Sequence, residues 1–257
     1  MNRVLLRVAY DGTNYCGWQA QDNGLAVEAV LNQTLTKVLK KDTAVIGASR
    51  TDSGVHARGN VAVFDNPSTI PPDRFVPVLN MHLPDDIRIM EAREVPEDFH
   101  PRYTEVMKTY IYRIDNEKIF HPVMRLWSAP VTFPLDIEKM REGASFLVGT
   151  HDFKSYCSAK TTVQDTVRTI EEITITKNGV LVEIRIRGNG FLYNMVRIIA
   201  GTLIRVGRGF YPPAYVKTML ERKKRNEDAI TAPACGLTLE KIDYPVLKKQ
   251  GENTHAV

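Results

Sequence analysis

The chain has 257 residues, enough for one large domain or two small ones. Its 43% hydrophobic and 25% charged residues are typical of a soluble globular protein. No apolar run reaches the ~18 residues of a membrane span, and the first residues lack a signal-peptide pattern, so we predict a cytoplasmic protein with no membrane partner.

The net charge and the spacing of the Cys and His residues limit which partners, metals and cofactors the sequence can be expected to bind. Lys and Arg number 34 against 30 Asp and Glu, a net charge of +4 that leans slightly toward a polyanionic partner. Cys16, Cys157 and Cys235 are odd in number and far apart, which excludes a disulfide framework and a zinc motif. The six His residues show no ligand spacing. We therefore predict no metal and no cofactor.

The first half of the chain reads β-α-β-α-β-β. Residues 3–10 are rich in strand formers and end at a turn formed by Asp11 and Gly12. An amphipathic helix follows, because apolar residues recur at helical spacing from Val27 to Val38. The remaining predicted elements are strands at 60–64, 87–95 and 108–114, and a short helix within 73–83.

The second half opens with a helix whose face runs from Ile137 to Leu147. Two alternating strands then span 167–188 around Asn178-Gly179, a strong hairpin signal. Further predicted elements are helices near 190–206 and 213–225 and a strand at 236–244.

This mixture predicts an α+β fold with a mixed, largely antiparallel sheet and helices, in two pseudo-symmetric halves around a central basic cleft. The halves are placed at 1–116 and 117–247, and 248–257 is predicted to be a disordered tail.

The stretch "IGASRTDSGVHARGNVAVF" at 46–64 places polar residues between two apolar segments. Asp52 follows Arg50 by two positions and begins the turn sequence Asp-Ser-Gly. Ordinary turn chemistry explains this pattern, because Asp and Ser bond nearby backbone and Gly tolerates positive φ. Taken alone, the pattern favours this ordinary turn, and a carboxylate held beside an arginine for catalysis is the alternative.

The predicted helix near 190 has an ordinary apolar face and an unusual second face. Asn194, Arg197, Gly201, Arg205 and Arg208 recur there at steps of three and four residues. A solvated helix face is one explanation. An arginine within an otherwise apolar helix also needs an anion, and Asp52 is the obvious candidate.

Four motifs together resemble the TruA-type tRNA pseudouridine synthases. They are "YDGTNYCGWQAQ", "SRTDSGVHA", "KTYIYRI" and "GFLYNMVRIIAGTL", in the order of that family, and the similarity runs from about residue 3 to 244. Departures are small: Ser53 stands where the family often has Ala, Asn60 where Gln is frequent, and "AVEAVL" opens the first helix differently. The Arg-Thr-Asp core is intact.

The resemblance implies an isomerase that converts uridine to pseudouridine at positions 38 to 40, in the anticodon arm of tRNA. Asp52 matches the essential aspartate of the family and is expected to be the nucleophile. Attack at C1′, attack at C6 and assistance to glycal formation all remain open. The family also implies a homodimer whose two subunits both contact the tRNA.

Other residues receive roles from the same resemblance. Arg50 matches an arginine that holds the displaced nucleotide, Tyr110 a tyrosine that lies against the target base, and Arg197 the helix arginine. An alternating core residue is the other explanation for Tyr110. His56, Arg58 and Arg205 are candidate RNA contacts, with turn packing equally open for His56 and Arg58.

Three rival functions are weaker. Asp-Ser-Gly also occurs in aspartic proteases, but these need two facing carboxylates and the chain has no second such triplet. "GNGFLY" lacks the third glycine of the dinucleotide fingerprint, and no phosphate loop is present. The alternative that stays open is a catalytically silent tRNA-binding or RNA-folding protein on the same scaffold.

Overall fold

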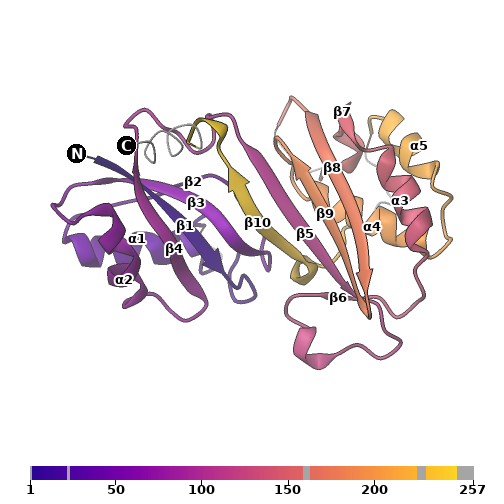
Figure 1. Cartoon of the computed structure of the whole chain (residues 1–257), viewed down its shortest axis with the longest axis horizontal. Helices are drawn as coiled ribbons and strands as arrows, with labels where there is room; N and C mark the ends of the chain where they lie inside the picture. The colour runs from indigo at the N-terminus through magenta and orange to yellow at the C-terminus, as the bar shows by residue number, and fades with distance from the viewer. Residues whose placement is uncertain (1, 22–23, 159–162, 225–229, 248–257) are drawn as a thin grey trace, which may run out of the picture. The chain divides into compact units, whose positions relative to one another are not determined.

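The computed structural model describes residues 2–21, 24–158, 163–224 and 230–247 (Figure 1). The chain forms two compact units, Met1–Val106 with Leu239–Val257 and Met107–Thr238. The first unit is therefore built from two separate stretches of chain. The predicted division at residues 116 and 117 and the predicted cleft stay predictions, and the predicted tail at 248–257 lies outside the described residues.

The first unit contains an antiparallel sheet in the order β4-β1-β3, with β10 beside β3 and the short β2 also paired to β3. The side chains of β1 that are buried are mainly apolar, from Val4 to Val8, as expected for a strand between two neighbours. The bounds are β1 Asn2–Tyr10, β2 Ile46–Gly47, β3 His56–Asn66, β4 Ile87–Val95 and β10 Leu237–Asp243.

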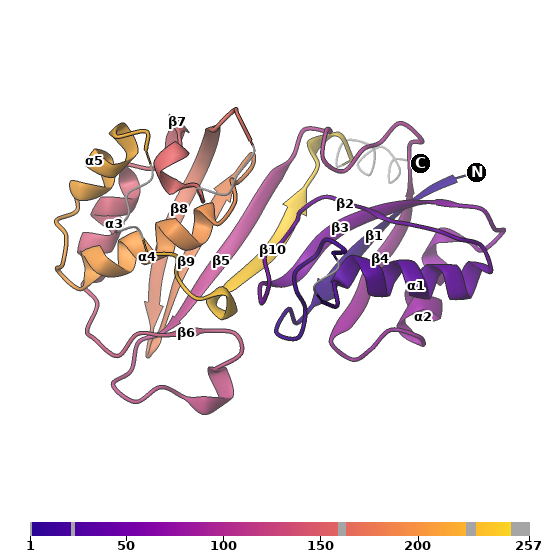
Figure 2. The same ribbon diagram turned by 180° about the vertical axis from the view of Figure 1, so that it is seen from behind.

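Helices α1 (Val27–Leu39) and α2 (Phe75–Asn80) lie against one face of this sheet (Figure 2). The predicted apolar stripe of α1 is buried at Val27, Leu31 and Leu35. The helix ends at Lys40, whose φ of 53° is left-handed. A 3-10 turn, Pro72–Arg74, precedes α2.

The second unit contains an antiparallel sheet in the order β5-β9-β8-β7, with β6 parallel to β5. The predicted hairpin is present, and Gly179 in its turn has a φ of +57°. The bounds are β5 Met107–Asp115, β6 Ala129–Pro130, β7 Gly149–Asp152, β8 Val167–Asn178 and β9 Leu181–Gly188.

Three helices cover one face of the second sheet: α3 (Ile137–Ser145), α4 (Met195–Gly207) and α5 (Tyr215–Glu221) (Figure 2). α4 is the most deeply buried of them, because only its arginines and Ile204 keep partial exposure. The remaining 3-10 turns are Pro122–Met124, Lys154–Tyr156 and Ala234–Gly236.

The structure confirms the predicted α+β class and its largely antiparallel sheet. Two predicted helices are shorter than expected. α4 begins at Met195 because Asn194 has a left-handed φ of 60°, and α5 ends at Glu221, shortly before Lys223 with a φ of 48°. The short strands β2, β6 and β7 were not predicted, since two to four residues carry too little alternation to be recognised.

Leu35→Ala tests the packing of α1 on the first sheet. Leu35 is fully buried, so the substitution should lower the free energy of unfolding by about 2–5 kcal/mol through lost burial and the cavity left behind. Gln33→Ala, on the exposed face of the same helix, should change it by less than about 0.5 kcal/mol. Urea denaturation of both variants measures the difference, and equal losses would contradict this packing.

Candidate active site

Asp52 lies on a turn between β2 and β3 that is held by backbone hydrogen bonds to the segment after β1. The amide of Trp18 donates to the Thr51 carbonyl at 3.1 Å, and the amide of Gly54 donates to the Tyr15 carbonyl at 3.3 Å. The Ser53 hydroxyl donates to the same carbonyl at 3.2 Å. Asp52 itself is half-buried. The turn is thus fixed at both sides of its carboxylate.

The segment around Gly17 and Trp18, which bonds the Asp52 turn, is itself bonded to the start of α1. The amides of Val27 and Glu28 donate to the carbonyls of Gly17 and Trp18 at 3.2 and 3.0 Å. These amides belong to the first turn of the helix, where no partner exists within the helix. α1 therefore anchors the loop that in turn anchors Asp52.

Gly17 lets these two segments approach closely. Its φ is +109°, and a Cβ at this position would lie 2.6 Å from the Thr51 carbonyl oxygen. Trp18, next in sequence, is 1% exposed and packs against Gly47 of β2, where a Cβ would lie 2.2 Å from the indole nitrogen. This contact was not predicted, although Gly17 and Trp18 stand together within the motif "YDGTNYCGWQAQ".

His56 lies at the start of β3 and its side chain is 8% exposed. The Gly12 amide donates to its Nδ1 at 3.1 Å, and Asp11 Oδ1 lies 3.1 Å from the same atom. Burial raises the pKa of Asp11, but hydrogen bonds from Thr13 and the neighbouring His56 outweigh it, so this pKa lies below its ordinary value. The other ring nitrogen of His56, Nε2, is buried and has no hydrogen-bond partner among the described residues.

The arginines of the motif differ in their surroundings. Arg50 is exposed beside Asp52. Arg58 is 67% exposed along its side chain and forms an ion pair with Glu240 at 3.2 Å. Arg58 therefore has a guanidinium accessible to RNA, whereas little of the His56 ring is exposed. The predicted RNA contacts of both residues stay predictions.

Tyr110 lies near the middle of β5, opposite Ile186 of β9, and is 8% exposed. Its ring meets that of Phe191 edge to face, with centroids 5.2 Å apart and an interplanar angle of 83°. Such a contact fixes the plane of the tyrosine ring. Phe191 precedes α4 and was not singled out from the sequence.

Arg197 lies in the first turn of α4 and its guanidinium is oriented by two bonds within the second unit. Nε donates to the Ala232 carbonyl at 2.8 Å, and Nη1 donates to Asn194 Oδ1 at 2.9 Å. The Ala232 amide returns a bond to the Arg197 carbonyl at 3.1 Å. Gly201 permits this crossing, because a Cβ there would lie 2.2 Å from the Ile230 carbonyl oxygen.

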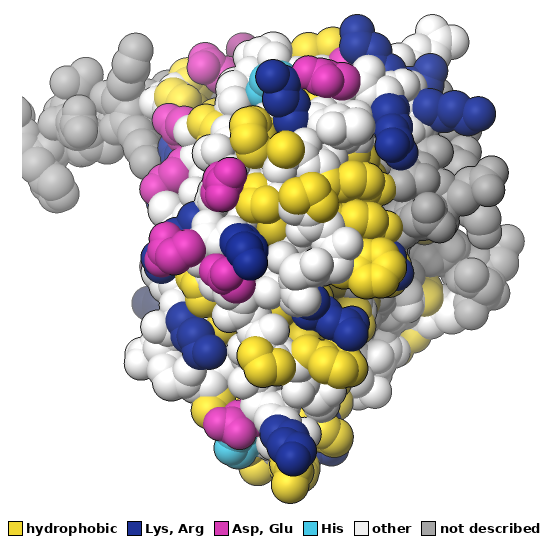
Figure 3. Space-filling model, turned by 90° about the vertical axis from the view of Figure 1, so that its right-hand side faces the viewer, with side chains coloured by type: hydrophobic (Ala, Val, Ile, Leu, Met, Phe, Trp, Pro, Cys, Tyr) yellow, Lys and Arg dark blue, Asp and Glu magenta, His cyan; other side chains and the backbone are white. Residues whose placement is uncertain are grey.

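Arg205 lies in the last turn of α4, and its guanidinium contacts two aromatic side chains. Its Nη1 donates to the Tyr211 hydroxyl at 3.1 Å, and its guanidinium lies 4.7 Å from the centre of the Phe210 ring. Figure 3 shows one face of the second unit, where Lys and Arg side chains are interspersed with hydrophobic and acidic ones. The predicted RNA contact of Arg205 stays a prediction.

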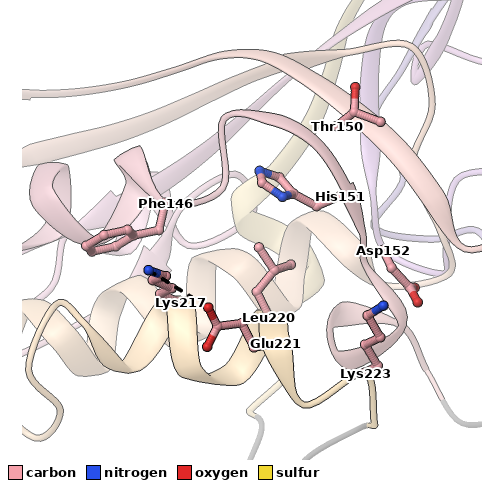
Figure 4. Close-up of a pocket in the computed structure, with 8 residues that line it drawn as sticks. All are labelled: Phe146, Thr150, His151, Asp152, Lys217, Leu220, Glu221 and Lys223. Carbon is pink, nitrogen blue, oxygen red and sulfur yellow. Dashed lines mark ion pairs between the residues drawn. The ribbon is translucent and has the colours of Figure 1, made fainter.

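A separate cavity of about 490 Å³ opens in the second unit between the end of α3, β7 and α5 (Figure 4). Its charges are mixed: Lys217 pairs with Glu221 at 3.9 Å, and Asp152 and Lys223 also line the wall. None of the predicted site residues lies among its lining residues, which are Phe146, Thr150, His151, Asp152, Lys217, Leu220, Glu221 and Lys223.

Among the described residues, no group of three or more His, Cys, Asp or Glu side chains is placed to hold a metal ion. Nor does the described part of the chain contain a helix of the length and apolarity that a membrane crossing requires.

Comparison with known proteins places this geometry in a family. A family model described as tRNA pseudouridine synthase matches residues 7–104 and 144–245, which include Asp52 and Arg197. The chain belongs to the tRNA pseudouridine synthase family.

Its relatives carry the name tRNA pseudouridine synthase A and match almost end to end. The protein of Thermoanaerobacter sp. (strain X514) is 45% identical over 95% of this chain and 100% of its own length. Those of Bacillus pumilus (strain SAFR-032) and Brevibacillus brevis (strain 47 / JCM 6285 / NBRC 100599) are each 45% identical, over 94% and 95% of this chain and 99% and 100% of theirs. The TruA-type resemblance predicted from the motifs is confirmed, and the chain is an isomerase.

Gly17→Ala tests the contact that holds the Asp52 turn. The new Cβ would collide with the Thr51 carbonyl in addition to straining a left-handed backbone, so the enzyme should lose both stability and turnover. Gly209→Ala is the matched control, because Gly209 also has a positive φ, +74°, but nothing lies within 4 Å of its added Cβ. The control should lose only the backbone cost of about 1–2 kcal/mol.

Thermal or urea unfolding and a turnover assay of both variants decide this test. Equal destabilisation by the two substitutions, with turnover unchanged in Gly17→Ala, would show that the close approach does not hold the turn.

Proposed function

We propose that this enzyme isomerises uridine to pseudouridine at positions 38 to 40 in the anticodon arm of tRNA, with Asp52 as the nucleophile. The observation that carries the proposal is the half-buried carboxylate on a turn fixed by Tyr15 and Trp18, within the part of the chain that matches the family model.

The reaction balances without an outside reagent. The bond from N1 of the base to C1′ of the ribose breaks, a bond from C5 to C1′ forms, C5 loses its proton and N1 gains one. No electrons pass to or from another molecule, so we propose no cofactor. Breaking a glycosidic bond leaves positive character at C1′, which a carboxylate stabilises or traps, and attack at C6 of the base begins from the same ionised group.

Arg50 and Tyr110 have roles that follow from access to the uridine. A base in a stem or loop must leave its stack, at a cost of a few kcal/mol, before its C1′ can be reached. The exposed guanidinium of Arg50 suits a group that clamps the displaced nucleotide. The Tyr110 ring, held in one plane by Phe191, suits a surface against the target base.

Arg197 has an electrostatic role in the proposal. Asp52 must stay ionised when substrate excludes water, and desolvation alone would raise its pKa. A cation with a fixed position lowers that pKa without reorganising, and the bonds from Arg197 to Ala232 and Asn194 supply such a position. We propose that this guanidinium is the cation that serves Asp52.

The substrate and assembly complete the proposal. The partner is the anticodon stem-loop of tRNA, recognised mainly through shape, phosphates and 2′-hydroxyls, with Arg58 and Arg205 as candidate contacts. The working form is a cytoplasmic homodimer in which tRNA contacts both subunits. The alternative is a silent tRNA-binding protein, which would need neither Asp52 nor Tyr110.

Asp52→Ala should abolish turnover. With tRNA carrying tritium at C5 of uridine and no added metal or nucleotide, the wild type should release tritium and Asp52→Ala should release none, since bond transfer to C5 expels its hydrogen. Asp73→Ala, which removes an exposed carboxylate of the same unit, should release tritium at the wild-type rate. Replacing the uridine at each of positions 38, 39 and 40 in turn identifies the sites used.

Tritium release by Asp52→Ala would remove Asp52 from the mechanism. Absence of release by the wild type, with tRNA binding retained, would favour the silent binding protein.

Arg197→Met should separate catalysis from binding. Loss of the cation should lower kcat by about 100-fold, the scale of one removed electrostatic stabiliser, while the Kd for tRNA changes less than about threefold. Arg208→Met is the control, because this guanidinium lies 3.8 Å from the Phe133 ring, at the far end of the same helix. Single-turnover tritium release and filter binding measure the two quantities, and an unchanged kcat would refute the assignment.

A further inference from the structure

A buried polar network contacts the segment that carries Arg50 and Asp52. Its members Tyr10, Thr51 and Asn60 are 5%, 7% and 0% exposed. The hydroxyls of Tyr10 and Thr51 are 2.7 Å apart, and Asn60 Nδ2 donates to the Tyr10 hydroxyl at 3.3 Å. Tyr10 and Asn60 belong to β1 and β3, whereas Thr51 belongs to the turn, so the network joins the turn to the sheet.

Asn60 makes a second tie to the same segment. Its Nδ2 also donates to the Ser49 carbonyl at 3.0 Å, while its Oδ1 accepts the Val61 amide at 2.9 Å. The amide group is thereby fixed at both ends. The two ties fall on either side of Arg50, at Ser49 and at Thr51, and the second is one residue before Asp52.

Packing alone does not require these polar atoms. Tyr10 already packs by its ring against Trp18, with centroids 5.9 Å apart, and phenylalanine would keep that contact. Burying hydroxyl and amide groups costs free energy that their hydrogen bonds only offset. The pairing of β1 with β3 also shifts register between Val8 and Tyr10, a bulge of the kind that re-aims a side chain beside an active site.

We propose that Tyr10 and Asn60 are positioning residues for the reaction: they hold Ser49 and Thr51 so that Arg50 and Asp52 keep their catalytic geometry. This inference rests on the proposed function of Asp52. Displacing a reacting group by about 1 Å costs about 100-fold in rate, so the network acts on kcat.

The test compares two tyrosine hydroxyls of the same unit. Tyr10→Phe removes the hydroxyl that bonds Thr51. Tyr244→Phe removes one that donates to the Pro101 carbonyl at 2.7 Å, from a ring 4% exposed. Both should lower Tm by a similar amount. Tyr10→Phe should lower kcat for tritium release by about 10- to 100-fold with KM within about threefold, and Tyr244→Phe should leave kcat within twofold of the wild type.

Thr51 supplies the conservative rescue. Thr51→Val keeps the shape of the side chain but loses the hydroxyl, and should lower kcat as Tyr10→Phe does. Thr51→Ser keeps the hydroxyl and should restore kcat to within about threefold of the wild type. The double variant Tyr10→Phe/Thr51→Val should be no slower than the slower single variant, because both remove one shared bond.

Two results would overturn the inference while the wild type and the Asp52→Ala variant behave as proposed. The first is an unchanged kcat in both Tyr10→Phe and Thr51→Val. The second is an equal loss of kcat in Tyr10→Phe and Tyr244→Phe, because a purely structural role of both hydroxyls would produce equal losses. Absence of turnover in the wild type is a different result: it overturns the proposed function, and the positioning role falls with it.

Discussion

Hydrogen bonds between two loops fix the turn that carries Asp52, and those loops are separated in the chain by the whole of α1. The amides of Val27 and Glu28, at the first turn of that helix, bond the carbonyls of Gly17 and Trp18, and Trp18 in turn bonds Thr51. Unsatisfied amides at a helix start are available in every helix. Here these amides bond a loop, so the position of α1 on the sheet helps to determine the position of the turn that carries Asp52.

Arg197 depends on a comparable local device in the second unit. Its guanidinium bonds Asn194 on one side and the carbonyl of Ala232 on the other, and the Ala232 amide bonds back to the helix. The turn that carries Asp52 and the guanidinium of Arg197 are thus each held by partners within their own unit. Groups that are fixed before substrate arrives do not pay a cost of reorganisation during the reaction, and this is the main source of electrostatic catalysis in enzymes.

Elements with a clear period could be predicted from the sequence, and the contacts between loops could not. The stripe from Val27 to Val38 and the turn at Asn178-Gly179 correctly gave α1 and the hairpin of β8 and β9. The start of α4 was placed too early, because nothing in the local pattern shows that Asn194 is left-handed.

The same limit applies to the site. Motifs singled out Asp52, Arg197 and Tyr110, but their supports are residues distant in the chain. Trp18 holds Thr51, Ala232 holds Arg197, and Phe191 meets Tyr110. Each is an ordinary apolar or small residue, and in two of the three cases a backbone atom makes the bond. Side-chain chemistry in the sequence carries no information about such bonds.

Because the first unit is built from two separate stretches of chain, its parts are synthesised at different times during translation. Residues of β10 beyond Thr238 belong to this unit and lie beside β3, although β1 and β3 leave the ribosome far earlier. The segment that orients Arg197, around Ala232, is also synthesised late. A nascent chain that has not yet reached Ala232 contains Asp52 and Arg197. It still lacks β10 beside β3 and the carbonyl that accepts a hydrogen bond from Arg197 Nε. β10 therefore joins the sheet of the first unit only after the whole of the second unit, Met107–Thr238, has been synthesised.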